Sequence, residues 1–195
     1  DDPIEKLAAL RRAAQIAEHG QHDSALALSY LGRALALASE PESLPELLGD
    51  YAQLAQATGR YAEYVTCLSE LAPHVLDPEQ RVRVYQDIAT IAHEKLADVA
   101  LARSAYRKAL EEQPEDMALL DALVELDTAA GDHAALIDVL GRKASLVLDA
   151  KQRALLLERQ ADVYERGLDD AAHAITALED AIAEFDGTAL IVSHD

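Results

Sequence analysis

The feature that most constrains the fold of this chain is a residue spacing that recurs about every three dozen positions. Three residues placed four and three apart, as in Ala102, Tyr106 and Ala109, lie on one face of a helix. The same spacing starts at positions 27, 64, 102, 136 and 174, so the successive gaps are 37, 38, 34 and 38 residues. A period of this length predicts an array of repeated helical units rather than one globule.

A second amphipathic helix and a turn precede each of these segments. Gly59 and Gly131 fall where the end of that preceding helix needs a left-handed residue. Asp98 and Asp170 fall where a side chain would cap the following helix. Aromatic residues are only 4% of the chain, and the apolar content is mostly alanine and leucine, which suits closely packed helices. We therefore expect helix–turn–helix units at about 4–38, 43–73, 78–113, 116–147 and 150–184.

Each unit alone would leave one apolar face bare, so stacking of neighbours is expected to bury it and to produce an all-α solenoid. The pattern resembles the tetratricopeptide repeat (TPR), with about five repeats over residues 4–184. The third unit matches the family's large and small positions and its terminal proline through Tyr85, Ala89, Ala102, Tyr106, Ala109 and Pro114. The resemblance implies a right-handed α-solenoid that acts as a non-catalytic scaffold and binds a peptide or helix of a protein partner in its concave groove.

In the family, the groove is lined by polar positions of the first helices. By register, these positions are Arg11, Gln15, Gln53, Gln56, Arg83, Gln86, Thr90, Asp121, Glu125, Glu158 and Asp162. The set shifts from Arg and Gln to Asp and Glu along the chain, which suits a partner with one acidic and one basic end. The alternative interpretation is an ordinary solvated helix surface. Gln15 and Asp50 stand where the family's chaperone-binding variant has asparagine, so chaperone-tail binding is not indicated.

The last residues, EFDGTALIVSHD at 184–195, differ from the helical pattern. They resemble the end of an ABC-F type nucleotide-binding domain, where a helix leads into a strand and a histidine corresponding to His194 contacts the γ-phosphate. No glycine-rich phosphate loop occurs in this sequence, so we expect no ATP binding. We predict a short non-helical C-terminal tail over 185–195.

The net charge of −19 disfavours nucleic acid and anionic membranes as partners. We expect this charge either to keep the protein soluble or to attract a basic partner. Cys67 is the only cysteine, so no intrachain disulfide can form. His19 and His22 lack further ligands in sequence, and we expect no metal, no cofactor and no catalytic residue. We expect no membrane span and no signal peptide, and favour the cytoplasm. An accessory fragment of a larger protein, such as an ATPase, and an array that self-associates through its open ends remain alternatives.

Overall fold

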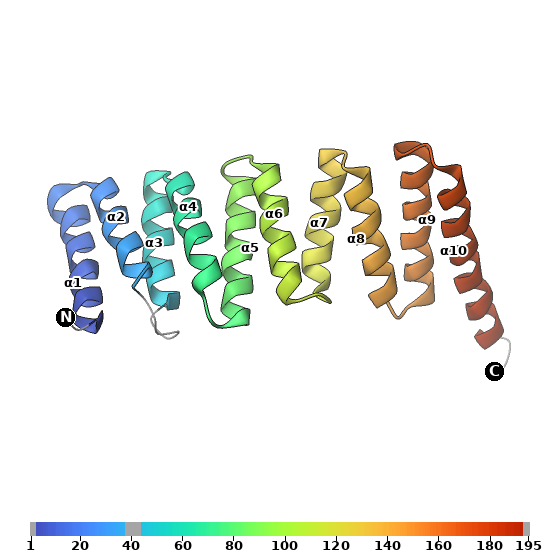
Figure 1. The fold of residues 1–195 in the computed structure, drawn as a ribbon, viewed down its shortest axis with the longest axis horizontal. Coiled ribbons are helices and arrows are strands. Elements are labelled where there is room, and N and C mark those ends of the chain that lie inside the picture. Colours follow the sequence, from blue (N-terminus) through green and yellow to red (C-terminus); the bar gives the residue numbers. More distant parts are fainter. Residues whose placement is uncertain (1–2, 38–43, 193–195) are drawn as a thin grey trace. The chain divides into compact units, whose positions relative to one another are not determined.

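The computed structural model describes the backbone of residues 3–37 and 44–192, and within these ranges it contains helices and no strand. The all-α prediction is confirmed. The helices follow one another in short antiparallel pairs (Figure 1). In chain order they are α1 (Pro3–Gln15), η1 (Ile16–Gly20), α2 (Ser24–Leu35), α3 (Leu44–Thr58), α4 (Tyr61–Leu71), η2 (Ala72–His74), α5 (Pro78–Glu94), α6 (Val99–Glu112), α7 (Met117–Ala130), α8 (His133–Leu146), α9 (Ala150–Gly167) and α10 (Ala171–Val192).

The chain divides into two compact units, residues 1–105 and 106–195, with the boundary inside α6. In unit 1 each helix packs on its neighbours in sequence: α1 on α2, α2 on α3, α3 on α4 and α4 on α5. Leu28, Leu47, Leu68 and Ile88 form the best buried part of this core. Packing between sequence neighbours is the arrangement that a repeat array requires.

Unit 2 follows the same rule, because α7 packs on α8, α8 on α9 and α9 on α10. Its larger core residues, Leu119, Leu120, Leu123 and Leu140, come from α7 and α8. The contact between α9 and α10 uses small residues instead, including Ala161, Ala174 and Ala177. Alanines allow two helices to approach closely, and leucine-rich helices leave a wider spacing.

A left-handed backbone residue recurs at each turn between the two helices of a pair. These residues are His22, Gly59, Ala97, Gly131 and Asp169, with φ values of 54°, 71°, 54°, 67° and 53°. Their separations of 37, 38, 34 and 38 residues equal those of the helical spacing in the sequence. The sequence predicts this conformation only where it offers glycine, so Gly59 and Gly131 are confirmed, and the other three were not anticipated.

Replacing Ala97 by glycine is expected to raise the free energy of unfolding by about 0.5–1 kcal/mol. The left-handed conformation costs a residue with a Cβ about 1–2 kcal/mol, and glycine avoids this cost. Part of the gain in stability is lost, because glycine also increases the conformational entropy of the unfolded chain. The matched control is Ala9→Gly at an exposed position inside α1, where stability should fall by about 0.5–1 kcal/mol. Urea unfolding of both variants checks this, and a loss of stability in both would contradict a strained turn at Ala97.

The predicted non-helical tail is wrong for residues 185–192, because α10 continues through them to Val192. The strand implied by the ABC-F resemblance is therefore absent over these residues, and His194 lies outside the described residues. The physical reason is that a lone strand needs a partner for its backbone N–H and C=O groups, and the described ranges contain no other strand. An existing helix adds one hydrogen bond for each further residue, and Gly187 costs it only about 1 kcal/mol.

Candidate functional site

The residues predicted to line a groove lie on alternate helices. Arg11 and Gln15 are in α1, Gln53 and Gln56 in α3, Arg83, Gln86 and Thr90 in α5, Asp121 and Glu125 in α7, and Glu158 and Asp162 in α9. All of them are exposed or half-buried. The first seven belong to unit 1 and the last four to unit 2, so the two sets are described separately.

Arg11 links the first two of these helices in unit 1. Its Nη2 donates to Glu46 Oε1 and to Asp50 Oδ2 in α3, both at 2.8 Å. The hydrogen bond from Arg11 lowers the pKa of the Glu46 carboxyl, and the same bond raises the pKa of Arg11. Two carboxylates therefore already neutralise this cation. Arg11 joins α1 to α3, and its capacity to attract an acidic partner is reduced.

Beside this ion pair lies a small hollow, which we call the polar hollow. It has a volume of about 230 Å³ and is lined by Arg11, Gln15 and Gln53, together with Glu18 and Asp50. Ala14, Leu31 and Leu54 also contribute to its walls. Three of the predicted groove residues, from α1 and α3, are thus brought together around one depression.

A second depression lies between α3 and α5, and we call it the apolar hollow. Its volume is about 290 Å³, and Leu48, Ala52 and Val84 provide apolar wall. Two charged residues of α5, Arg83 and Asp87, also line it. An apolar hollow with a few polar groups at its edge is the ordinary form of a site for one side chain of a ligand.

Two residues of the apolar hollow were not predicted from the sequence. The hydroxyl of Tyr64 donates to the backbone oxygen of Leu48 at 3.4 Å, and burial raises the pKa of this phenol. Asp87 is exposed at the surface, but neighbouring groups remove part of the hydration of its carboxyl. This desolvation raises the pKa of the carboxyl. Residues four apart lie on the same face of a helix, so the sequence places Asp87 one turn beyond Arg83 in α5. Nothing in the sequence indicates the apolar hollow that both residues line.

Several of the predicted side chains have no partner within the described residues. Gln15, Gln53, Gln56, Arg83 and Gln86 make no hydrogen bond or ion pair there through their side chains. Each glutamine offers an amide donor and acceptor, and Arg83 offers a fork of N–H donors. Unit 1 therefore presents uncommitted polar groups on α1, α3 and α5.

Some of the predicted acidic groove residues of unit 2 already have ion-pair partners. Asp121 accepts from Lys143 of α8, and Asp162 pairs with Arg166 one turn later in α9 at 3.4 Å. Glu125 and Glu158 have no ion pair within the part of the chain that the structure describes. The acidic half of the predicted groove thus contains two free carboxylates, which lie on different helices.

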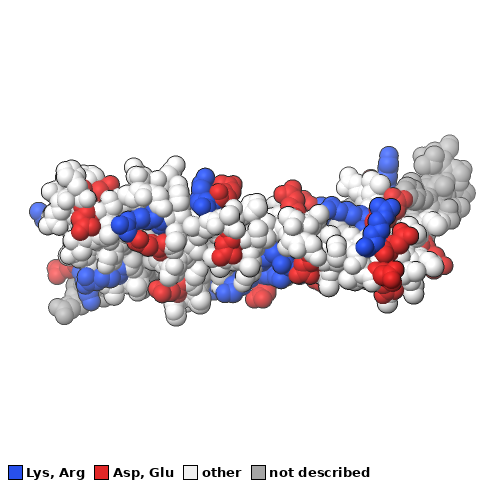
Figure 2. Space-filling model, turned by 90° about the horizontal axis from the view of Figure 1, so that it is seen from above, with Lys and Arg blue, Asp and Glu red and all other residues white. Residues whose placement is uncertain are grey.

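Charge is mixed on the face that Figure 2 presents, where basic and acidic side chains are interspersed with uncharged ones. Among the side chains that the structure describes, in 4–37 and 44–184, His, Cys, Asp and Glu form no group that could hold a metal ion. None of the helices described is both long and apolar enough to cross a bilayer.

One apolar stripe is exposed in unit 2. Ile175, Leu178 and Ile182 of α10 are 57%, 43% and 59% exposed, and their spacing places them along one side of the helix. In a repeat array, a stripe of this kind is the surface that a neighbouring unit would cover. Self-association through open array ends, as expected from the sequence, stays a prediction.

No family model and no curated protein matches this chain. Among solved structures it is similar to YrrB, described as a TPR protein with an unusual peptide-binding site, at 14% identity and a TM-score of 0.46, covering 90% of this chain and 84% of that one. It is similar to MamA at 14% identity and a TM-score of 0.46, covering 88% and 94%. It is also similar to pilF of Pseudomonas aeruginosa at 21% identity and a TM-score of 0.45, covering 93% and 82%.

Proposed function

We propose that this protein is a non-catalytic scaffold whose unit 1 binds a peptide segment of a partner protein across α1, α3 and α5. The observation that carries the proposal is the set of uncommitted donors and acceptors on these three helices beside two hollows. A peptide offers the matching groups, because each of its residues has one N–H and one C=O. Glutamine side chains can bond both of them.

The apolar hollow gives the proposed peptide an anchor point. Its volume of about 290 Å³ suits one large apolar side chain, and Leu48 and Val84 provide the contact surface. Arg83 lies at its edge and has no partner within the described residues, so a carboxylate next to the anchor would gain a charge-assisted hydrogen bond. We therefore expect the preferred peptides to combine a large apolar residue with a nearby acidic residue.

A library of random peptides displayed on phage and selected against the full chain tests this proposal. Selected peptides should bind the wild-type protein and bind Arg83→Glu roughly tenfold more weakly, because the carboxylate would then face a like charge. Gly49→Leu should weaken binding as well, since a Cβ at Gly49 meets no atom within 4 Å and the longer side chain has room to enter the hollow. Fluorescence anisotropy measures each affinity.

The control for the charge change is Arg12→Glu. Arg12 is an exposed arginine of α1 that has no ion pair in the part of the chain that the structure describes and lines neither hollow, so its reversal should leave affinity unchanged. The control for the added bulk is Ala62→Leu, at an exposed position of α4. Equal losses in Arg83→Glu and Arg12→Glu, or failure of the wild-type chain to select any peptide, would exclude the proposal.

A further inference from the structure

We infer that unit 1 carries a second site, where α2 and α4 end and α3 and α5 begin, for a small amphiphile with an apolar body and a cationic group. The ends of α2 and α4 and the starts of α3 and α5 lie along one edge of the unit in Figure 1. A cavity of about 910 Å³ lies among these four ends. We call it the edge cavity. It shares Leu44 and Gln80 with the apolar hollow, but the rest of its lining comes from the ends of α2 and α4 and the segment before α5, outside the peptide site.

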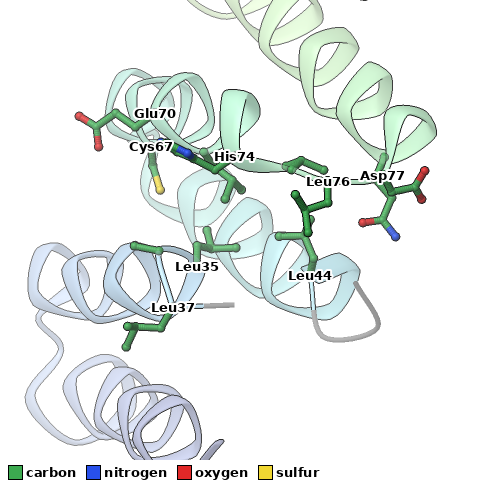
Figure 3. Close-up of a pocket in the computed structure, with 13 residues that line it drawn as sticks. Leu35, Leu37, Leu44, Cys67, Glu70, His74, Leu76 and Asp77 are labelled. Carbon is green, nitrogen blue, oxygen red and sulfur yellow. The ribbon is translucent and has the colours of Figure 1, made fainter. Parts of the chain in front are cut away.

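The walls of the edge cavity are mainly apolar. Leu35 ends α2 and Leu37 follows it, Leu44 begins α3, and Val75 and Leu76 come from the segment before α5. Figure 3 shows Leu44 and Leu76 side by side within it. The volume lies within the range of sites for drug-sized ligands, about 300–1,000 Å³. The chemistry of the walls therefore suits a hydrocarbon body.

One wall residue, Leu76, exposes apolar surface that a bound ligand would cover. The Leu76 side chain is 87% exposed, although it is a large apolar group at the mouth of an apolar cavity. Most exposed leucines of a protein surface are isolated, but this one continues the surface formed by Leu44 and Val75. An apolar ligand in the cavity would remove part of this surface from water and gain about 25 cal/mol for each Å² covered.

The inner wall is formed where α2 approaches α4. A Cβ built on Gly32 would lie 3.6 Å from Cys67 Sγ, which is an ordinary contact, so the two helices are close there without strain. Burial raises the pKa of the Cys67 thiol to about 11. The thiol is therefore neutral at physiological pH and adds to the apolar wall as a small weakly polar group.

The charges of the lining determine the sign of the ligand. Glu70 of α4 and Asp77 before α5 are carboxylates, and Figure 3 shows them on opposite sides of the cavity. No lysine or arginine is among the lining residues that the structure describes, and His74 is the only other titratable group besides Cys67. A cationic head would be attracted at either side, whereas a fatty acid or another anion would be repelled.

The test compares two probes of equal length, octylammonium and octanoate, by isothermal titration calorimetry on the full chain below their micelle concentrations. Octylammonium is expected to bind up to about fivefold more tightly than octanoate, because one exposed charge pair contributes up to about a factor of five. Octylammonium should also raise the melting temperature. Equal binding of the two probes, no binding of octylammonium, or a lowered melting temperature would overturn the inference.

Two variants locate the binding. Ala36→Trp adds bulk at an exposed position in the lining and should abolish octylammonium binding, whereas Ala62→Trp, at an exposed position of α4 outside the lining, should retain it. Glu70→Gln should bring the affinities of the two probes closer together, whereas Glu79→Gln, which also removes one exposed carboxylate, should not. Identical behaviour of either variant and its control would place the probe elsewhere. None of these results depends on peptide binding, so the two proposals succeed or fail separately.

Discussion

Replacing Leu68 by alanine is expected to lower the free energy of unfolding by about 3–5 kcal/mol. Leu68 is fully buried in α4, at one of the positions that define the recurring spacing, and its removal would leave a cavity that helices on both sides cannot close. Both the lost transfer free energy and the cavity contribute to this cost. Urea unfolding followed by far-UV circular dichroism measures it.

Leu76→Ala is the matched control for this prediction. It deletes the same atoms from a side chain that is 87% exposed, so its effect should stay within about 0.5 kcal/mol. A small effect at Leu68, or equal effects at both positions, would mean that the helical register assigned to unit 1 is wrong. The comparison therefore tests the repeat pattern through a single pair of leucines.

Replacing Asp127 by alanine is expected to cost about 2–3 kcal/mol. Asp127 is fully buried near the end of α7, and its two carboxylate oxygens accept from Arg107 Nη2 at 3.3 and 3.4 Å. Loss of a hydrogen bond to a charged group costs about 1.5–3 kcal/mol. The larger cost of leaving a buried charge without a partner does not apply to Arg107, because its side chain is half exposed and can be hydrated.

Asp127→Asn serves as the second variant, because it keeps the shape and one acceptor oxygen. It should lose about 1 kcal/mol, less than Asp127→Ala. Chemical denaturation of both variants on the background of the full chain gives the comparison. If Asp127→Ala were as stable as the wild type, the contact with Arg107 would contribute nothing to unit 2.

The helix pairs could be predicted because their determinants are local. Asp98 caps α6 by accepting from Leu101 N at 2.9 Å, and Asp170 accepts from His173 N at 3.2 Å before α10, as the sequence indicates. Gly59 and Gly131 adopt the left-handed conformation that a helix end requires. Ala97 adopts it too, although alanine does not indicate it, because the tertiary position of the turn imposes the conformation. Asp169 also adopts it, and aspartate does so more readily than most residues.

The end of the chain shows where local preference fails. The residues after Gly187 are β-prone by type, yet α10 continues through them to Val192. β-branched residues have only slightly lower helix propensity than others, and a strand forms only where another strand supplies a partner. Residue preference alone could not supply that partner, so the prediction of a tail was wrong.

The candidate site was only partly predictable. The spacing selects Gln15, Gln53 and Arg83 as exposed positions of first helices, but it does not indicate which of them have partners. Arg11 is bound to Glu46 and Asp50, which are 35 and 39 residues away. Such pairs depend on how one helix is rotated against the next, and the two hollows depend on the same packing. The groove assignment as a whole therefore stays a prediction.

Hydrogen–deuterium exchange of the full chain with and without a selected peptide tests the central claim most directly. The proposed function predicts added protection in 3–15, 44–58 and 78–94, the helices α1, α3 and α5, and unchanged exchange in 24–35 and 61–71, the helices α2 and α4. Protection confined to α2 and α4, or to unit 2, would contradict a peptide site on the first helices of unit 1.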